Sequence, residues 1–354
     1  MQLPSSPGAG TPIRKTIAML PGDGIGREVL DAAEHVLRSL PELDFTYTEH
    51  PCGAGEYLRA GNPLPPSTLD ACRSADATLL GAMGLPDVRW PDGREMAPQL
   101  DIREQLELFA GVRPVKLYNP AHSPLRKPSI DFILIRESTE GLFSTRLRPR
   151  QQLAAEVCDE LRVSRTGAER LFRFSFRLAR TRDKRLTLID KANVLPSMAF
   201  FREIFYEIAA EYPDVEPSHV YVDAAALYMV QSPERFDVCV TENMFGDILS
   251  DLAAGTIGGM GLAPSADIGN EHAVFQPAHG SAPDIAGKGI ANPVATIISA
   301  AMMLEWFGEP ACQAAATRLR NAVERVLGDP ANATPDVGGR LTTPELTARI
   351  VEAL

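Results

Sequence analysis

Short apolar runs alternate with longer stretches of helical periodicity along most of this chain. Runs of the length expected for buried strands lie at 16–20, 77–80, 130–135, 186–189, 220–222 and 236–240. Helical spacing follows the first run as far as Leu37, and recurs at 171–178, 293–307, 311–326 and from Thr343 onward. Strands that alternate with helices predict an α/β fold.

Three local signals add detail to this pattern. Residues 100–109 have helical spacing, and Gly111 is expected to end that helix. The segment 166–169, Thr-Gly-Ala-Glu, has the pattern of a capping box at the start of the helix at 171–178. After Asp251 the chain becomes rich in glycine, which predicts a mobile or ligand-contacting loop.

One strand-to-helix junction carries two carboxylates at helical spacing. The run at 236–240 is followed by apolar positions at 244, 248 and 252, so Asp247 and Asp251 lie one turn apart on one helix face. Two carboxylates at that spacing repel each other or share a cation. The pair indicates either a divalent metal site or two solvated aspartates on an exposed helix.

Charged side chains follow other predicted strands in the same way. Arg136 follows the run at 130–135, Lys191 comes just after 186–189, and Asp223 follows 220–222. Ligands of open α/β sheets collect at the carboxyl ends of the strands. An edge that brings together a guanidinium, an amine and three carboxylates favours the metal site for Asp247 and Asp251.

Two more arginines, Arg103 and Arg113, lie in and after the predicted helix at 100–109. The planar fork of a guanidinium binds a carboxylate through two parallel hydrogen bonds. A surface ion pair would explain either arginine taken alone. The two residues are therefore candidates for binding an acidic substrate.

Two glycine-rich segments have the composition of ligand loops. Segment 21–26, Pro-Gly-Asp-Gly-Ile-Gly, joins a strand to a helix and is either a phosphate loop or a tight turn. Because Arg27 stands where the dinucleotide fingerprint needs its third glycine, a Rossmann fold is excluded. The second segment, 276–289, contains small residues that permit close approach of a ligand, and Asp284 offers acceptors for ribose hydroxyls.

Composition narrows the class of protein. A chain of 354 residues predicts two joined domains, and its net charge of −11 argues against binding to nucleic acid. Five scattered cysteines without metal-type spacing predict free thiols in a reducing, cytoplasmic compartment. The first residues are rich in Pro, Ser and Gly and predict a flexible leader, and no apolar run is long enough to span a membrane.

Four motifs occur together in the order seen in one known family. They are Leu-Pro-Gly-Asp-Gly-Ile-Gly at 20–26, Asp-Lys-Ala-Asn-Val at 190–194, Phe-Gly-Asp-Ile-Leu-Ser-Asp at 245–251 and His-Gly-Ser-Ala-Pro-Asp-Ile-Ala-Gly at 279–287. From about residue 15 to 350 the chain resembles the isocitrate and isopropylmalate dehydrogenases, which are metal-dependent β-decarboxylating enzymes. It is more similar to the isopropylmalate, tartrate and D-malate enzymes than to NADP-dependent isocitrate dehydrogenase.

The resemblance implies a two-domain fold of the isocitrate/isopropylmalate dehydrogenase type. The expected division is a leader at 1–14, a large α/β domain with the cofactor segment at 15–108 plus 258–354, and a small α/β domain with the dimer interface at 109–257. The resemblance also implies a homodimer with shared active sites, in which Lys191 and Asp223 reach the site of the partner subunit.

The resemblance further implies roles for individual residues at the matching positions. Lys191 and Asp223 would be catalytic, and Mg²⁺ or Mn²⁺ would be held by Asp223, Asp247 and Asp251. The substrate, a small hydroxy diacid, would contact Gln99, Leu100, Arg103, Arg113, Arg136 and Asn193. The cofactor would contact His279, Gly280, Ser281, Ala282, Asp284, Ile285 and Asn292, and it would be NAD because the acid at 284 repels the 2′-phosphate of NADP.

Four positions depart from the family pattern. Phe143 replaces a tyrosine that supplies a proton after decarboxylation, and Gln99-Leu100 replaces the leucine pair of isopropylmalate enzymes. Gln276 and Met96 each replace a glutamate. The predicted function is therefore NAD- and metal-dependent oxidation, with decarboxylation, of a malate-like 2-hydroxy diacid: D-malate, tartrate or a 3-substituted malate. The alternatives are the 3-isopropylmalate dehydrogenase of leucine biosynthesis, oxidation with poor decarboxylation, and a non-catalytic regulatory subunit.

Overall fold

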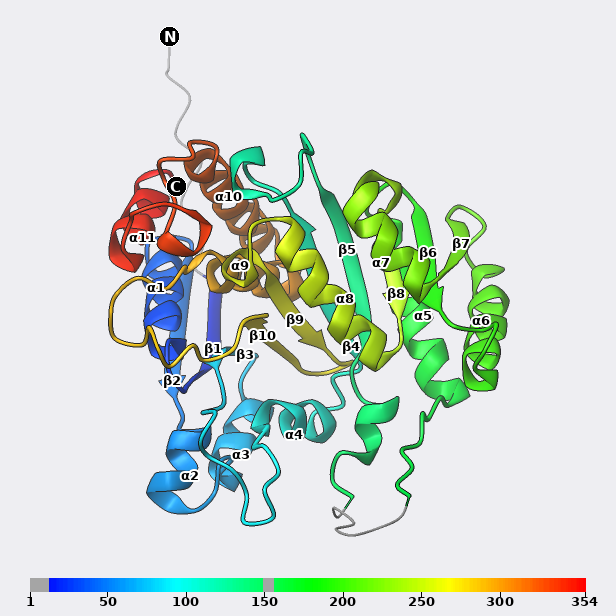
Figure 1. Ribbon diagram of the computed structural model, residues 1–354. Coiled ribbons are helices and arrows are strands. Elements are labelled where there is room, and N and C mark those ends of the chain that lie inside the picture. The colour runs from blue at the N-terminus through cyan, green and yellow to red at the C-terminus, as the bar shows by residue number, and fades with distance from the viewer. Residues whose placement is uncertain (1–12, 149–155) are drawn as a thin grey trace.

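A mixed sheet of ten strands runs through the centre of the molecule, with helices packed around it (Figure 1). The computed structural model describes residues 13–148 and 156–354. The strands, in the order in which they lie in the sheet, are β2 (Leu43–Glu49), β1 (Ile13–Gly22), β3 (Ala77–Ala82), β10 (Ala273–Pro277), β9 (Pro264–Ile268), β4 (Ala110–Lys116), β5 (Asp131–Glu137), β8 (Val238–Thr241), β6 (Arg185–Asp190) and β7 (Glu216–Tyr221).

The α-helices are α1 (Gly26–Arg38), α2 (Ala54–Ala60), α3 (Pro66–Ser74), α4 (Pro98–Gln105), α5 (Arg165–Ala179), α6 (Pro196–Ala209), α7 (Val222–Gln231), α8 (Asn243–Thr256), α9 (Val294–Phe307), α10 (Pro310–Leu327) and α11 (Thr343–Glu352). Short 3₁₀ turns lie at Pro120–His122, Leu142–Thr145, Pro233–Arg235, Met260–Leu262 and Pro335–Val337. The predicted α/β class is confirmed.

The sheet reverses its strand direction at the centre. β1, β2, β3 and β10 are mutually parallel, and so are β5, β8, β6 and β7, while β9 and β4 connect the two groups by antiparallel pairing. The strands from β2 to β9 come from residues before 108 and after 258. The strands from β4 to β7 come from residues 109–257, so two segments of sequence form the two sides of one sheet.

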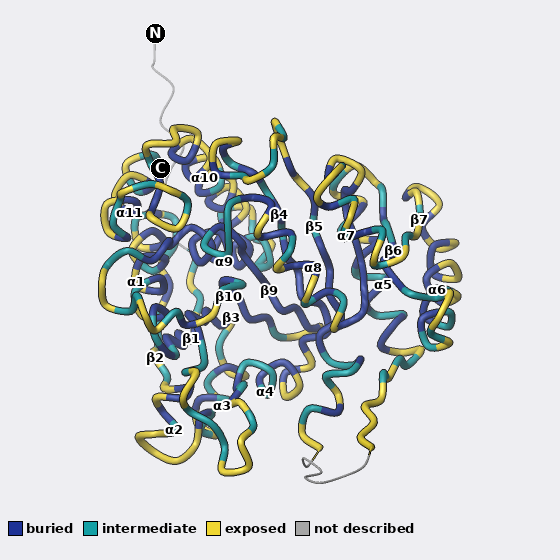
Figure 2. Tube along the Cα trace, viewed as in Figure 1, coloured by how far each residue is buried: buried dark blue, intermediate teal, exposed yellow. Residues whose placement is uncertain are grey.

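The core follows from the apolar patterns of the helices. α9 packs on β9 and β10, and its residues from Val294 to Leu304 are all buried, which explains why its sequence is apolar on every side. α8 packs on β5, and α5 packs on β8 and β6 together with α6. The buried residues form a continuous layer along the strands (Figure 2).

Several predicted boundaries were wrong. α4 ends at Gln105 because Glu107 has a positive φ of 52°, and Gly111 and Arg113 lie in strand β4 rather than at the end of a helix. The helix at 171–178 begins at Arg165 and is capped by Ser164, whose Oγ accepts from the Gly167 amide, so the expected capping box does not form.

Other differences concern the segments between the predicted strands. The first residues of the expected loop after Asp251 are still helix, since α8 continues to Thr256, and the loop begins at residue 257. β1 begins at Ile13, inside the expected leader, and residues 1–12 lie outside the described part of the chain. The short strands β2, β9 and β10 were not predicted. β9 carries polar residues at 265 and 267 that interrupt an apolar strand pattern.

The glycine-rich turn at 21–26 is held together by its own aspartate. Asp23 is buried, and its carboxylate accepts hydrogen bonds from the backbone amides of Ala54, Gly55 and Gly84, each at 2.8 Å. The backbone amide of Ile25 donates to the Ser281 carbonyl at 2.8 Å. The segment is therefore a tight turn that ties three parts of the chain together, the second of the two alternatives for this sequence.

Replacing Asp23 with asparagine is expected to lower the free energy of unfolding by about 2–3 kcal/mol, because the new NH₂ group faces backbone donors that need an acceptor. Urea unfolding of wild type and variant measures the difference. The matched control is Asp44→Asn, which removes the exposed ion pair with Arg14 and should change stability by less than about 1 kcal/mol. Equal unfolding midpoints for the Asp23 variant and wild type would contradict this role.

Candidate active site

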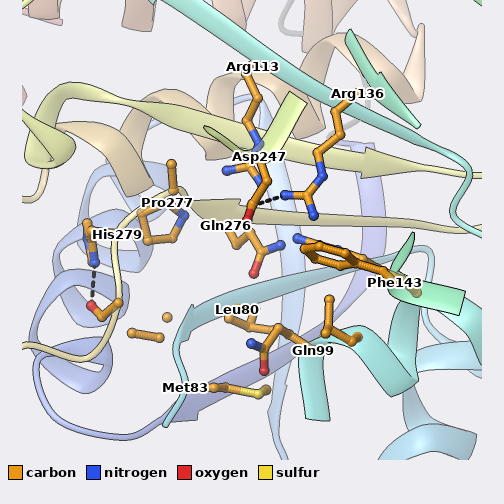
Figure 3. A pocket seen from close by; sticks show the side chains of 16 residues that line it. Leu80, Met83, Gln99, Arg113, Arg136, Phe143, Asp247, Gln276, Pro277 and His279 are labelled. Carbon is orange, nitrogen blue, oxygen red and sulfur yellow. Dashed lines mark hydrogen bonds and ion pairs between the residues drawn. The ribbon is translucent and has the colours of Figure 1, made fainter. Parts of the chain in front are cut away.

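A polar cavity of about 250 Å³ lies between the centre of the sheet and the chain segments that follow β3 and β10 (Figure 3). Its lining includes three arginines, two glutamines and an aspartate from distant parts of the sequence. These six residues are Gln99, Arg103, Arg113, Arg136, Asp247 and Gln276. Leu100 and Phe143 contribute apolar surface. A small anionic molecule matches a cavity of this size and charge.

The register of the central strands explains how these side chains meet. Val274, Asp267, Gly111 and Arg136 are successive Cα partners across β10, β9, β4 and β5. Paired residues in a sheet project from the same face, so Asp267 and Arg136 point the same way from either side of Gly111. A Cβ at position 111 would lie 2.8 Å from Ser138 Oγ, so the glycine keeps this row open.

Arg136 is the most buried of the three arginines, with 2% of its surface exposed. Its Nε and Nη2 donate to Asn243 Oδ1 at 2.9 and 2.7 Å, and its Nη1 donates to Asp247 in a close contact. Three of the five N–H groups of the guanidinium are thus used, which leaves one on each terminal nitrogen for a ligand carboxylate. Burial lowers the pKa of Arg136 to about 10, so the group remains charged at neutral pH.

Arg103 and Arg113 reach the cavity from α4 and β4. Arg103 Nε donates to Asp267 Oδ2 at 2.9 Å, in an ion pair that is almost completely buried. Arg113 is also buried, which lowers its pKa, and its Nε has no hydrogen-bond partner within residues 13–148 and 156–354. A buried cation with an unpaired donor is costly unless a ligand anion binds there.

The helix prediction for the two carboxylates is confirmed, since Asp247 and Asp251 both lie in α8. Burial, with the neighbouring charge of Asp247 as the second cause, raises the pKa of Asp251. Carboxylate oxygens are the ligands that Mg²⁺ and Mn²⁺ prefer, so the pair has suitable chemistry for either ion. In the described residues of a single chain, no three acidic, histidine or cysteine side chains are grouped closely enough to hold a metal.

The structure does not bring Lys191, Asn193 and Asp223 into this cavity. Lys191 follows β6, and its Nζ donates to Asp223 Oδ1 at 2.5 Å. Asp223 lies in the first turn of α7, because β7 ends at Tyr221, and the hydrogen bond from Lys191 lowers its pKa. Asn193 is exposed in the turn after β6. Within one chain these residues form a second, separate cluster of charges.

The expected cofactor segment lies beside the cavity. His279 Nδ1 donates to the Gly280 carbonyl at 2.8 Å, which leaves Nε2 as an acceptor that is buried without a partner in the described chain. Burial lowers the pKa of His279, so the ring is neutral at pH 7. An unpaired acceptor of this kind suits the amino group of an adenine ring.

The other residues of this segment divide into internal and exposed positions. Ser281 Oγ donates to the Gly84 carbonyl, and Asn292 Nδ2 donates to Asp336 at 3.1 Å, so both side chains stabilise the loop itself. Ala282 has a positive φ of 38°, and Ile285 packs with it against α1. Asp284 is exposed and free to meet a ribose.

Two residues that organise the cavity were missed by sequence reasoning. Asn243 holds Arg136, and Asp267 holds Arg103 together with Gln276, whose Nε2 donates to Asp267 Oδ2 at 2.5 Å. Asp267 carried no clear signal, because it lies in a segment, 264–268, whose apolar pattern is interrupted by polar residues. Asn243 carried no signal, since a polar residue at the start of a helix is common.

No helix among the described residues has the length and hydropathy needed to cross a membrane.

Comparisons with known proteins agree on one family. A family model described as isocitrate/isopropylmalate dehydrogenase matches residues 16–353. A 3-isopropylmalate/3-methylmalate dehydrogenase of Methanocaldococcus jannaschii is 42% identical over 351 residues, covering 95% of this chain and 98% of the relative. An isocitrate/homoisocitrate dehydrogenase of Thermus thermophilus is 44% identical over 340 residues, with coverage of 96% and 98%.

A solved structure extends this similarity to the fold. The isocitrate dehydrogenase of Methylococcus capsulatus superposes with a TM-score of 0.87 at 39% sequence identity, covering 96% of this chain and 98% of that one. The isopropylmalate dehydrogenases of this family generally use NAD and Mg²⁺ or Mn²⁺. By sequence, fold and cavity, the chain belongs to the isocitrate/isopropylmalate dehydrogenase family and is a decarboxylating dehydrogenase of hydroxy acids.

Proposed function

We propose that the protein oxidises and decarboxylates malate itself or a malate that carries a substituent at C3, with NAD and Mg²⁺ or Mn²⁺ as cofactors. The observation that carries this proposal is the group of three buried arginines around one cavity, which matches a substrate with two carboxylates. The substrate's 2-hydroxyl then faces α8, where Asp247 and Asp251 lie. A 2-hydroxy diacid therefore places its carboxylates near the arginines and its hydroxyl near Asp247.

The first candidate substrate is 3-isopropylmalate, an alternative in the sequence analysis that the relatives favour. Several similar proteins are named 3-isopropylmalate dehydrogenases, and one of them is named for 3-methylmalate as well. Leu100, Leu80 and Met83 provide apolar surface in the cavity for an alkyl group. The principal prediction from sequence, a malate-like diacid such as D-malate or tartrate, is the second candidate.

The observation that favours the second candidate is the side chain of Gln99. Its Oε1 lies buried at the cavity without a partner among the described residues. An alkyl substituent would leave this acceptor unpaired, at a cost of about 1–3 kcal/mol, whereas a hydroxyl would pair with it. A compact or hydroxylated substituent therefore has a specific group to recognise it.

The proposed chemistry assigns a task to each charged residue. The arginines bind and orient the two carboxylates. Lys191 of the partner subunit would accept the proton of the 2-hydroxyl, and bound NAD would accept the hydride from C2. A Mg²⁺ or Mn²⁺ ion would be held by Asp247 and Asp251 together with Asp223 of the partner subunit, and when bound it would supply electrophilic stabilisation of the oxygen at C2. Loss of CO₂ then leaves negative charge at C3 that has to be protonated.

The site is proposed to be completed in a homodimer. Seven exposed large apolar side chains lie on elements that contact one another around β6 and α7 or in the turn after β6, and Ile248 is 57% exposed. They are Val194, Tyr206, Tyr221, Leu227, Val230, Met244 and Ile248, from α6, β7, α7, α8 and the turn after β6. A two-fold interface through α7 and α8 would bring Lys191 and Asp223 of the partner subunit toward Asp247.

The same proposal includes a domain division and a compartment. We divide the sheet between β9 and β4, into residues 15–108 plus 258–354 and residues 109–257, because the strands on each side come from one of these segments. The cytoplasm suits a protein whose five cysteines are free thiols, four of them buried.

NAD is expected to be used with a kcat/KM roughly a hundredfold higher than that of NADP, because neutral His279 offers no positive charge to a 2′-phosphate and the carboxylate of Asp284 repels it. Initial rates of absorbance change at 340 nm with either cofactor measure the ratio. Asp284→Asn, which removes the carboxylate, should reduce the preference for NAD. Equal efficiency with both cofactors in the wild type would contradict the proposal.

Phe143→Tyr is expected to raise the rate of CO₂ release relative to NADH formation. Phe143 lines the cavity below Arg136, with its ring 5.0 Å from the guanidinium, and it has no proton to donate to C3. A tyrosine hydroxyl at this position adds a donor, for which general acid catalysis supplies about 10²-fold at the low end of its range. Parallel assays of NADH and CO₂ measure the ratio, and an unchanged ratio would show that another proton donor is sufficient.

The decisive test of the function is a screen with 3-isopropylmalate, 3-methylmalate, D-malate, tartrate, isocitrate and homoisocitrate in the presence of NAD and Mn²⁺. D-malate or a malate with an alkyl or hydroxyl substituent at C3 should give the highest kcat/KM. Binding of one of these acids without NADH production would instead favour a regulatory subunit. NADH formation without CO₂ would favour oxidation with poor decarboxylation.

A further inference from the structure

A buried carboxylate lies directly behind the arginine cavity. Asp267 in β9 is 1% exposed, and one oxygen of its carboxylate, Oδ2, accepts from both Arg103 Nε at 2.9 Å and Gln276 Nε2 at 2.5 Å. Arg103 and Gln276 both line the cavity, so Asp267 holds two of its walls from behind. Any change at Asp267 therefore reaches the ligand through these two side chains.

The contact with Asp267 decides which end of the Gln276 amide faces the ligand. A carboxylate only accepts hydrogen bonds, so the NH₂ group of Gln276 has to point toward Asp267 and its Oε1 has to point away. Figure 3 shows the side chains of Gln276 and Gln99 projecting among the lining residues. The cavity therefore presents the Gln276 oxygen to a ligand, and the Gln99 oxygen is a second acceptor buried in its wall.

The charges of the cavity lead to the same conclusion. Three buried arginines contribute three positive charges. Asp267 offsets one of them at a buried position, whereas Asp247, which pairs with Arg136, is 49% exposed on its side chain, so solvent screens its charge. A ligand with two carboxylates offsets the charges that remain. A third carboxylate would meet the Gln276 oxygen and no unmatched cation, which disfavours its burial.

We propose that Asp267 is a positioning residue that selects dicarboxylates over tricarboxylates, by fixing Arg103, turning the Gln276 oxygen toward the ligand and offsetting one arginine charge. This inference rests on the proposed function in taking malate-like acids as the ligands. It extends that function by naming the residue that excludes a third carboxylate. Asp267 itself lies behind the cavity wall and acts through its two partners.

A purely structural ion pair is the competing explanation, and another pair in the molecule shows what one looks like. Asp237, also 1% exposed, uses both oxygens: Oδ1 accepts from Arg182 Nε at 2.7 Å and Oδ2 accepts from the Arg185 amide at 3.2 Å. Asp267 Oδ1, by contrast, is buried without a hydrogen-bond partner among the described residues. A half-paired carboxylate stabilises the fold poorly, so stability alone does not account for Asp267.

The test moves the negative charge between the two partners. Asp267→Asn removes it, Gln276→Glu adds a second one, and the double variant Asp267→Asn/Gln276→Glu restores a single charge at a neighbouring position. Asp237→Asn is the matched control, since it alters a buried Asp–Arg pair outside the cavity. For each protein, kcat/KM is measured with isocitrate as the tricarboxylate and with 3-isopropylmalate and D-malate as dicarboxylates.

Asp267→Asn is expected to raise about tenfold the ratio of kcat/KM for isocitrate to kcat/KM for a dicarboxylate. The reason is that one arginine charge is no longer offset and can form a charged hydrogen bond with the third carboxylate. The double variant should return the ratio to within about threefold of wild type, and Asp237→Asn should leave it unchanged while lowering Tm. Gln276→Glu places two carboxylates in contact, so its activity should fall at neutral pH and recover as pH is lowered and one of them is protonated.

Three results would overturn the inference: an unchanged ratio in Asp267→Asn, a shifted ratio in Asp237→Asn, or a wild type that prefers isocitrate. If Asp267→Asn does not fold, the pH profile of Gln276→Glu decides in its place, and a profile like that of wild type counts against the inference. The shifts in Tm that each acid induces in the presence of Mn²⁺ compare the binding of isocitrate with that of the dicarboxylates without turnover. A wild type without dehydrogenase activity would refute the proposed function, while these shifts would still decide the role of Asp267.

Discussion

Arg136→Lys is expected to lower kcat/KM several-hundred-fold, roughly the loss of two charged hydrogen bonds worth about 3–4 kcal/mol in total. The guanidinium of Arg136 keeps one free N–H on each terminal nitrogen because Asn243 and Asp247 use the other three. A lysine ammonium cannot contact Asn243, Asp247 and both oxygens of a ligand carboxylate at once. Since the arginine orients the reacting acid, we expect kcat as well as KM to change.

Steady-state kinetics with the best acid from the screen measures this loss. The matched control is Arg182→Lys, which alters a partly buried arginine that bonds Asp237 and Asp131 away from the cavity. That variant should lose stability and retain its kcat/KM. An Arg136→Lys enzyme within tenfold of wild type would show that this arginine does not bind the substrate.

Two inactive variants, Lys191→Met and Asp247→Asn, are expected to restore activity when their subunits are mixed. Each change alone should reduce kcat by about 10³-fold or more, through loss of a proton acceptor or of a metal ligand. In the proposed homodimer each site combines Asp247 of one subunit with Lys191 of the partner subunit. A mixed dimer therefore contains one site with both changes and one site with neither.

Random exchange of subunits should recover about one quarter of wild-type activity, because half of the dimers are mixed and each of these has one intact site of two. The variants are unfolded and refolded together, and activity is compared with that of each variant treated alone. Absence of recovery, with mixed dimers shown by mass spectrometry of the intact assembly, would place Lys191 and Asp247 in the same subunit. In the control pair, Lys191→Met and Asp223→Asn, both changed residues are contributed by the same subunit to a given site. Each site of a mixed dimer then carries one of the two changes, so this pair, unlike the first, should recover no activity.

The elements predicted best were those with strong local patterns. α8 and its two aspartates follow from helical periodicity, and β3, β5, β6 and β8 follow from short apolar runs at nearly the observed positions. The helix at 100–109 was predicted too long because apolar Leu106, Leu108 and Phe109 continue its pattern. The positive φ of Glu107 ends it, and periodicity carries no signal for that conformation.

The candidate site divides in a similar way. Arg103, Arg113, Arg136, Asp247 and the glutamine at 99 were all identified from sequence, and the structure brings them to one cavity. Asp267 and Asn243 were missed, because each acts on an arginine more than 100 positions away in the sequence. Such contacts depend on strand order and register, which a single sequence does not encode locally.

The sequence by itself determined the α/β class, the chemical types available to the site and the departures at Phe143, Gln99 and Gln276, because these depend on residue type and short-range spacing. The tertiary structure alone decided that β9 and β4 run antiparallel through the centre of the sheet, and that Val274, Asp267, Gly111 and Arg136 form one row. It also separated Lys191 and Asp223 from the arginine cavity within one chain. The physical reason is that periodicity reports which face of an element is buried, whereas the partner of each face is chosen by packing over the whole chain.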